Sequence, residues 1–328
     1  MLMMSWAACV AAALAGVLLD RWLGEPRRWH PLVGFGRLAA ALEARLNRPA
    51  RSPACSPIRQ RTAGLLAWAT MVLVPAALAW GLIVLAQRVH PALAWALHAV
   101  ALYAALGACS LAQHIAPIAA ALARDDLADA RRLTARIVSR DTTDADAEAL
   151  ARAACESALE NGNDAIFGAL FWFFIGGAPA VIVFRLANTL DAMWGYRTPR
   201  LLHFGWAAAR LDDWLNLIPA RLTALTYALL GATGQALRCW RTQAPAWSSP
   251  NAGPVMAAGA GAVGVTLGGG ARYHGEWEER PPLGVGERPG AAHVDACLRL
   301  VQRTLWLWLG LAMLSVPLMK AMGTGIAR

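Results

Sequence analysis

Acidic, amide and arginine side chains gather in one stretch of the chain, residues 139–213, on both sides of an uncharged hydrophobic run over residues 165–184. Carboxylates can accept protons or hold a divalent cation, and arginines can bind phosphate groups. Ionisable groups beside a segment apolar enough to enter a bilayer are costly unless they pair or do chemistry. The stretch is therefore the first candidate for a functional site.

The polar residues before the run predict a helix with a charged stripe. At 100° per residue, Arg152, Glu156 and Asn163 share one stripe, and Glu160 lies beside them. Side chains of residues 141–144 are expected to cap the start of this helix. A surface helix laced by Arg–Glu pairs is the simpler interpretation, and composition alone favours it.

The polar residues after the run form two groups. Arg185, Asn188 and Thr189 share a helical face. Further along, the adjacent pair Asp212 and Asp213 can hold a divalent cation or simply cap the following turn. The residues alone do not decide between these two roles.

The hydrophobic run itself is interrupted by the sequence GGAP at residues 176–179. Each half is too short to span a bilayer, so a re-entrant helical hairpin competes with a single span. A hairpin would return Arg185 to the membrane face that carries Asp164, whereas a single span would separate the two polar groups. A single site made from both polar groups therefore favours the hairpin.

Composition places the whole chain in a membrane. Of 328 residues, 57% are hydrophobic and 16% are charged, which argues against a soluble protein. The net charge of +9 comes from arginines in the links between apolar runs, as the positive-inside rule expects, and this disfavours nucleic acid as a partner.

The single lysine, Lys320, excludes a P-loop. The sequence GAGAVG at residues 259–264 lacks a preceding strand and indicates close helix packing rather than a dinucleotide site.

The predicted fold is all-α, a polytopic helical membrane protein with four to five spans and one domain over residues 1–328. The N-terminal side is expected outside, and His98 is interpreted as a packing residue rather than a ligand. The polar segments 124–164 and 185–303 are expected to be cytoplasmic and to carry the site. The expected membrane segments are residues 1–19, 62–87, 91–123, 165–184 and 304–319.

The order of the polar clusters resembles the CbiB/CobD family of cobalamin biosynthesis, the adenosylcobinamide-phosphate synthases. The resemblance runs from Asp20 to the last span. The family usually has aspartate where this chain has Glu25, a change that keeps the charge. The matching motifs are DRWLGEPRRWHP from Asp20, SRDT from Ser139, RAACESALENGND from Arg152, FRLANTLDAMWGYR from Phe184, FGWAAARLDD from Phe204, IPARL from Ile218, SPNAG from Ser249, LGGGARYHG from Leu267 and RPPLG from Arg280.

The resemblance implies an ATP-dependent ligase that joins a carboxylate of adenosylcobyric acid to aminopropanol or its phosphate. ATP with Mg²⁺ is then the co-substrate, and the corrinoid is a substrate. The implied location is the cell inner membrane, multi-pass, with the active face cytoplasmic. Other proteins of the cobalamin pathway are possible partners besides the lipid bilayer.

The resemblance also assigns roles to residues in the matched motifs. The implied catalytic carboxylates, among them the proton acceptor, are Asp141, Glu156, Glu160 and Asp164. The implied Mg²⁺ ligands are Asp212, Asp213 and Glu160. Implied binders of phosphate and substrate are Arg140, Arg152, Arg185, Asn188, Asp191, Arg197, Arg210, Asn251 and His30. Asn161 would orient substrate, and glycines 268–269 would let backbone N–H groups approach an anion.

Two other classes compete with the enzyme. A sensor-like relative without catalysis would keep the spans and lose the acid and arginine clusters, which are dense here. A transporter draws support from the interrupted run, because broken helices mark transport sites, but inverted repeats are not visible.

Overall fold

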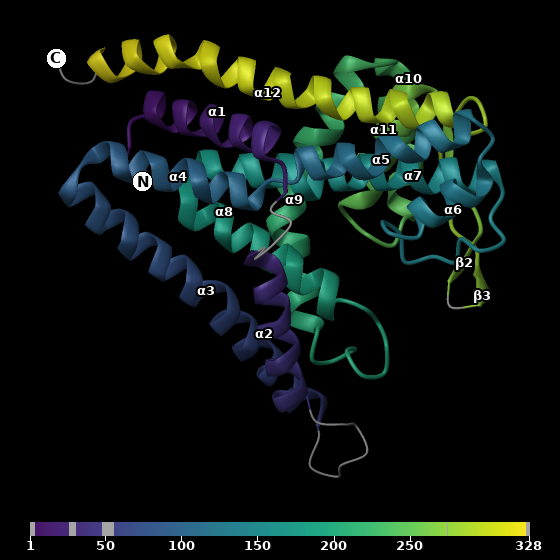
Figure 1. The fold of residues 1–328 in the computed structure, drawn as a ribbon, viewed down its shortest axis with the longest axis horizontal. Helices are drawn as coiled ribbons and strands as arrows, with labels where there is room; N and C mark the ends of the chain where they lie inside the picture. Colours follow the sequence, from purple (N-terminus) through teal and green to yellow (C-terminus); the bar gives the residue numbers. More distant parts are fainter. Residues whose placement is uncertain (1–3, 26–30, 48–55, 274, 326–328) are drawn as a thin grey trace. The chain divides into compact units, whose positions relative to one another are not determined.

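The structure is a computed structural model that describes residues 4–25, 31–47, 56–273 and 275–325, and it is built from helices with a few short strands (Figure 1). Five helical stretches in this described part are long and apolar enough to cross a membrane. The all-α polytopic prediction is therefore confirmed. The five stretches are Trp6–Leu23, Pro57–Val89, Pro91–Ala123, Ala147–Trp194 and Ala291–Met319.

The chain divides into two compact units, each of which is discontinuous in sequence. Unit 1 comprises residues 1–106, 168–215 and 311–328, and unit 2 comprises residues 107–167 and 216–310. Each unit is described by itself below.

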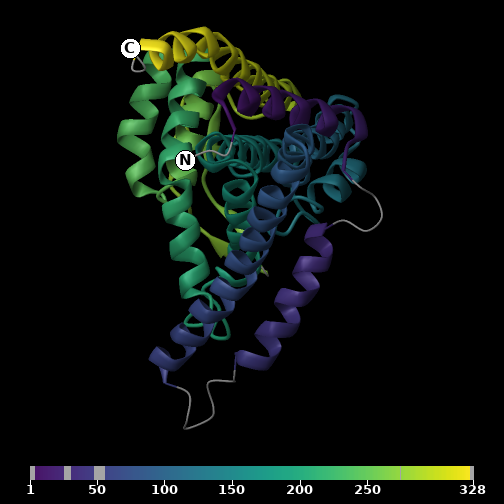
Figure 2. The ribbon, with the colours of Figure 1, turned by 90° about the vertical axis from the view of Figure 1, so that its left-hand side faces the viewer.

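Unit 1 is a helical assembly with an apolar core. Phe35, Trp68, Leu190 and Phe204 are among its buried side chains, and the ring of Trp194 packs edge-on against Phe204 at 5.1 Å between centroids. Helices α2 and α3 lie side by side in this unit (Figure 2). Its helices are α1 (Trp6–Leu23), α2 (Pro31–Leu46), α3 (Pro57–Val89), α4 (Pro91–Ala105) and α8 (Gly168–Trp194), with the start of α9 (Trp206–Leu230) and the end of α12 (Ala291–Gly325).

Helix α8 reverses its direction at Gly177, whose backbone is non-helical at φ 64° and ψ −146°. A Cβ on Gly168 would lie 2.1 Å from the ring of Phe184, although a continuous helix would separate these residues by about 24 Å. The predicted helical hairpin is therefore confirmed, and its depth in a bilayer stays a prediction. Nδ1 of His98 accepts a hydrogen bond from the backbone N–H of Ala178 at 2.9 Å, so this histidine caps the second half of the hairpin.

Replacing Gly177 with alanine is expected to lower the thermal unfolding midpoint in detergent. Alanine at this position would have to keep the positive φ of Gly177, and its Cβ would lie 2.5 Å from the ring of His98. Such backbone strain costs about 1–3 kcal/mol. Gly81→Ala is the matched control, because Gly81 is a helical glycine with nothing within 4 Å of an added Cβ. Equal midpoints for the two variants would contradict the strained reversal.

The third predicted span is not one helix. Helix α4 ends at Ala105, and α5 (Ala108–Ala123) begins after a break at residues 106–107. Gly107 has φ −134° and ψ 29°, and its backbone N–H donates to the carbonyl of Ala165 at 3.0 Å instead of continuing the helix. The predicted membrane segment 91–123 is one of the candidate spans. Its break at residues 106–107 was not predicted, because hydropathy does not register a backbone hydrogen bond made far along the chain.

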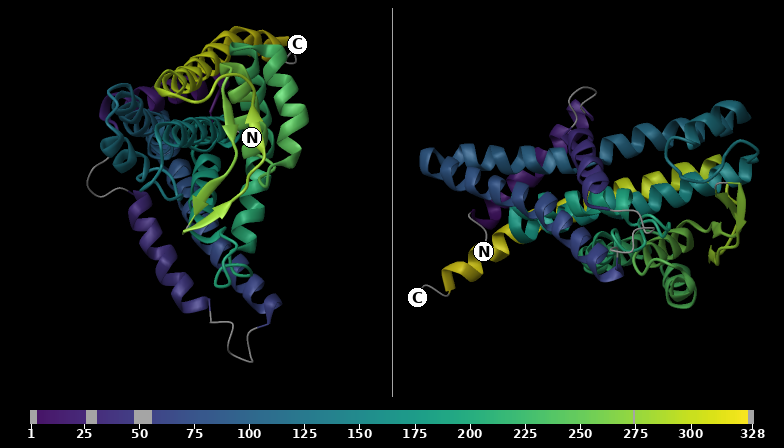
Figure 3. Two further views of the ribbon diagram at one scale, coloured as in Figure 1. Left: turned by 90° about the vertical axis from the view of Figure 1, so that its right-hand side faces the viewer. Right: turned by 90° about the horizontal axis from the view of Figure 1, so that it is seen from below.

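Unit 2 contains α7 (Ala147–Gly162), further helices, and two small antiparallel strand pairs, β1 with β4 and β2 with β3 (Figure 3). Its strands are β1 (Thr266–Gly268), β2 (Ala271–Tyr273), β3 (Glu276–Glu278) and β4 (Pro282–Gly284). Its other helices are α5, α6 (Leu127–Thr134), α10 (Thr233–Gln243) and α11 (Ala252–Val263), with the end of α9 and the start of α12.

The glycines of GAGAVG lie in or next to α11 and serve packing. A Cβ on Gly259 would lie 2.6 Å from Leu159 of α7, and one on Gly261 would lie 2.8 Å from the backbone of Ala236 of α10. Gly264 ends the helix in the left-handed conformation. The prediction of close helix packing in place of a dinucleotide site is confirmed.

Candidate functional site

The carboxylate of Glu156, on α7, is the point where unit 2's polar segments meet. Its side chain is 3% exposed. Arg140 donates to Oε2, and Arg280 donates to Oε2 at 3.0 Å and to Oε1 at 3.3 Å. The backbone N–H of Gly268 donates to Oε1 at 2.9 Å. One carboxylate therefore joins α7 to the loop before it, to the end of β1 and to the segment that carries Arg280.

These contacts make Glu156 an anchor rather than a proton acceptor. Both of its oxygens are occupied by donors, and two guanidinium groups stabilise its charged form. Arg280 also lies over the ring of Trp247, 5.4 Å from the centroid. Burial disfavours the charge of Arg280, but Glu156 outweighs that effect and raises the pKa of Arg280 above its ordinary value.

Glycine at position 268 is required by this anchor. The backbone of Gly268 has φ 72°, and a Cβ there would lie 2.2 Å from the carbonyl oxygen of Pro281. The backbone N–H of Gly268 thus binds a carboxylate of the protein itself, and the approach of residues 268–269 to an anion of a substrate stays a prediction.

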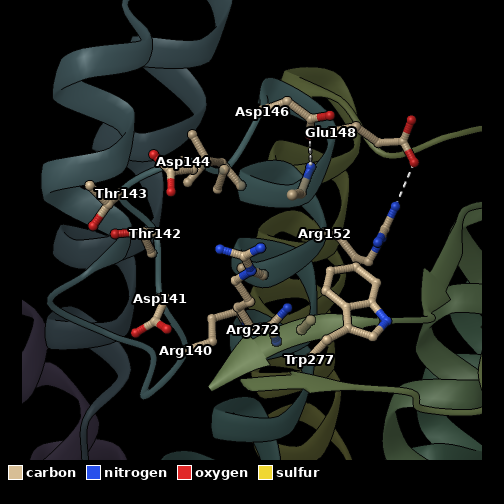
Figure 4. Close-up of a pocket in the computed structure, with 16 residues that line it drawn as sticks. Arg140, Asp141, Thr142, Thr143, Asp144, Asp146, Glu148, Arg152, Arg272 and Trp277 are labelled. Carbon is tan, nitrogen blue, oxygen red and sulfur yellow. Dashed lines mark hydrogen bonds and ion pairs between the residues drawn. The ribbon is translucent and has the colours of Figure 1, made fainter. Parts of the chain in front are cut away.

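A cavity of about 560 Å³ lies beside the anchor, between the loop before α7 and the strands β2 and β3. Figure 4 shows the acidic loop on one side, Arg152 and Trp277 on the other, and Arg140 and Arg272 between them. The cavity is lined by Arg140, Asp141, Thr142, Thr143, Asp144, Ala145, Asp146, Glu148, Ala149, Leu150, Arg152, Ala153, Gly270, Ala271, Arg272 and Trp277.

The loop that carries the acids is held in place by hydrogen bonds of its own. Oδ2 of Asp141 accepts from the backbone N–H of Gly275 at 2.7 Å, and its backbone N–H donates to the carbonyl of Arg272 at 2.9 Å. Asp146 caps α7 by accepting from the N–H of Ala149 at 2.8 Å. The predicted cap within residues 141–144 was therefore wrong by a few residues, because Asp141 is already used by the β2–β3 segment.

Three arginines face this cavity, and they differ in how firmly they are paired. Arg140 binds Glu156, and Arg152 donates to Glu148 at 2.5 Å. No ion pair of Arg272 is found in the described part of the chain, and its side chain is exposed. Arg272 is thus the cation most available to an added anion.

The structure brings some of the predicted residues of unit 2 together and separates others. Arg140, Asp141 and Arg152 line the cavity, and Glu156 lies behind it. Glu160 and Asp164 follow Glu156 at four-residue intervals along α7 and the π-helical turn after it. Two further predicted residues bond within the unit: Asn161 donates to the carbonyl of Ser157 at 2.9 Å, and Asn251 accepts from Arg221 at 2.5 Å.

The remaining predicted residues belong to unit 1. Asn188 donates to Asp212 at 3.4 Å, which links the second half of α8 to α9. Burial raises the pKa of Asp213, with Arg210 and Arg197 opposing the shift. Arg185 and Asp191 lie on the same half of α8. A single site formed from both units stays a prediction, and His30 lies outside the described residues.

Within the described ranges, no group of three or more His, Cys, Asp or Glu side chains is arranged to hold a metal ion. Mg²⁺ that arrives with a nucleotide needs only one or two carboxylates, since phosphate oxygens and water complete its octahedron. The adjacent carboxylates Asp212 and Asp213 fit that requirement in unit 1, and Asp141 and Asp144 fit it in unit 2. The expected ligand Glu160 lies in unit 2.

Sequence reasoning missed Arg280, Arg272 and Trp277. Arg280 begins the matched motif RPPLG, and Arg272 lies within LGGGARYHG, so the motif order contained a signal for both. Trp277 lies outside the matched motifs. Only the strand pairing, which opposes Trp277 to Arg272, reveals its place beside the cavity.

Comparison with known proteins places these features in a family. The family described as CobD/Cbib protein matches residues 13–301. Cobalamin biosynthesis protein CobD of Chromobacterium violaceum is 56% identical over 306 residues, covering 93% of this chain and 96% of the relative. The protein of the same name from Mycobacterium tuberculosis H37Rv is 43% identical, covering 88% and 90%. Cobalamin biosynthesis protein CbiB of Salmonella arizonae is 34% identical, covering 93% and 94%. No solved structure matches.

Proposed function

The chain belongs to the CobD/CbiB family of cobalamin biosynthesis proteins, and from this premise we propose that it is an ATP-dependent amide ligase. The proposed reaction joins a carboxylate of adenosylcobyric acid to the amine of aminopropanol or its phosphate. The product is adenosylcobinamide or its phosphate, and the enzyme is then adenosylcobinamide-phosphate synthase. The proposed location is the cell inner membrane, with the active face in the cytoplasm.

The chemistry requires activation, because a carboxylate and an ammonium do not form an amide spontaneously in water. Transfer of the terminal phosphoryl group of ATP to the substrate carboxylate gives an acyl phosphate and ADP. The amine then attacks the acyl carbon, phosphate leaves, and a carboxylate of the protein takes the amine's proton. Mg²⁺ would neutralise phosphate oxygens when the nucleotide is bound.

One observation carries the proposal: an arginine-lined and acid-lined cavity is fixed to the rest of unit 2 through the buried anchor Glu156. Arginines bind phosphate through paired N–H donors, and carboxylates on the opposite wall suit a cation or a proton. A sensor-like protein without catalysis would not need these arginines and carboxylates around one cavity. These residues support a phosphoryl-transfer and proton-transfer site.

The test is substrate-dependent ATP consumption by the purified protein in detergent, with isotope-labelled aminopropanol or its phosphate and adenosylcobyric acid. We expect labelled amide and ADP in equal amounts, with neither formed when one substrate is left out.

The reversal at Gly177 favours a transporter as the second candidate, because broken helices also mark transport sites. Substrate movement in vesicles without ATP-linked amide formation in detergent would favour that candidate and reject the ligase.

Cysteine labelling tests the proposed sidedness of the membrane. Thr143→Cys in unit 2 and Thr198→Cys in unit 1 replace exposed loop residues. Both are expected to react with an impermeant maleimide only after intact cells are opened, whereas Val89→Cys, at a position 71% exposed at the end of α3, should react from outside. Opposite labelling of the two loop positions would break the prediction of a single cytoplasmic site.

A further inference from the structure

Trp277 presents a fixed aromatic surface at the edge of the cavity. Its side chain is 63% exposed although it is large and apolar. Its Nε1 donates to Glu279 at 2.7 Å, and its ring lies against Gly270, where an added Cβ would stand 2.0 Å from Cζ2. The ring is thus held by the protein and lines the cavity, where Figure 4 shows it next to Arg152.

Arg272 stands directly across the strand pair from Trp277. The register of β2 and β3 pairs these two residues, so their side chains project from the same face of the hairpin. Both line the cavity. An aromatic plane therefore lies beside a cation that has no ion pair in the described residues.

We propose that this cavity is the nucleotide subsite of the ligase, with Trp277 stacking on the base and Arg272 binding the phosphates together with Arg152. The inference rests on the proposed function and goes beyond it by assigning one of three substrates to one place. An aromatic plane accepts the face of a base, and arginines accept phosphate oxygens. The carboxylates of the loop before α7, on the opposite wall, would then bind the Mg²⁺ that accompanies the phosphates.

The cavity suits the nucleotide better than the other two substrates. Its volume of about 560 Å³ lies within the range of roughly 300–1,000 Å³ that small-molecule sites have. A corrinoid carrying an adenosyl group is far larger than this space. Aminopropanol or its phosphate is far smaller, and neither has an aromatic face to cover Trp277.

Binding measurements on the purified full chain in detergent separate the base from the phosphates. The two probes are a non-hydrolysable imido analogue of ATP and inorganic tripolyphosphate, which lacks the base. Trp277→Ala is expected to raise the dissociation constant of the analogue about ten-fold and to leave that of tripolyphosphate unchanged. Arg272→Ala is expected to weaken both ligands.

Two further variants guard against a loss of folding. Trp277→Phe keeps an aromatic ring and should recover most of the affinity for the analogue. Trp80→Ala removes a tryptophan that is 57% exposed on α3 and should alter neither ligand. Equal weakening of both ligands by Trp277→Ala, or no weakening of either, would overturn the inference.

The outcomes also separate this inference from the proposed function. ATP-dependent amide formation with an unchanged KM for ATP in Trp277→Ala would leave the ligase standing and reject the nucleotide subsite. The predicted binding pattern without any amide formation would keep the subsite and reject the ligase.

Discussion

Replacing Glu160 with glutamine is expected to lower the kcat of amide formation by about 10²–10⁴-fold, the usual contribution of a general base. The KM values should change little, because the substitution keeps the shape of the side chain. Glu160 is the favoured proton acceptor because its carboxylate makes no ion pair or hydrogen bond in the described part of the chain, whereas Glu156 is fully engaged. The measurement is isotope-traced turnover at saturating substrates.

Asp164→Asn is the comparison for this experiment. Asp164 lies one turn further along and accepts a hydrogen bond from Asn163 at 2.9 Å, so its carboxylate is partly engaged. We expect Asp164→Asn to retain more activity than Glu160→Gln. Near-normal kcat in Glu160→Gln, together with a large loss in Asp164→Asn, would transfer the role to Asp164.

Replacing Glu156 with glutamine is expected to destabilise the protein by about 3–5 kcal/mol, as when one partner of a buried ion pair is removed. Arg140 and Arg280 have side chains only 13% and 9% exposed, so their charges would be left buried without a carboxylate. Turnover should fall with stability, because the loops that form the cavity would lose their common attachment. Thermal unfolding in detergent and limited proteolysis of residues 139–146 measure both effects.

Glu148→Gln is the matched control, because Glu148 also binds two arginines but in a more open position. Its side chain is 32% exposed, and its partner Arg288 is 88% exposed. Exposed pairs contribute about 0–1 kcal/mol, so this variant should keep nearly full stability. Equal losses of stability in Glu156→Gln and Glu148→Gln would mean that the loss comes from general helix disruption rather than from the anchor.

Short-range patterns in the sequence predicted the elements well. The uncharged runs marked the candidate membrane helices, and GGAP marked the reversal at Gly177. Glycine spacing in α11 indicated helix packing, which the close approach of Gly259 to Leu159 confirms. Each of these signals is local, since it depends on residues within a few turns of each other.

Partners far apart in the chain could not be predicted in the same way. The stripe through Arg152 and Glu156 implied neighbouring roles, yet Arg152 pairs with Glu148 on its own helix, and Glu156 pairs with Arg140 and Arg280. A helical wheel shows which side chains share a face but not which loop returns to it. Short strands were equally invisible, because three-residue segments around glycines carry no periodicity.

If the hairpin that reverses at Gly177 enters and leaves the membrane by one face, as proposed, it also sets the parity of membrane crossings. Such a hairpin adds no net crossing, so the other four of the five candidate segments would carry the chain across an even number of times. The start of α1 and the end of α12 would then lie on the same side of the membrane, opposite the polar loops. A fusion reporter placed at either position would therefore give the same signal, and an insertion that straightened α8 would invert everything that follows it.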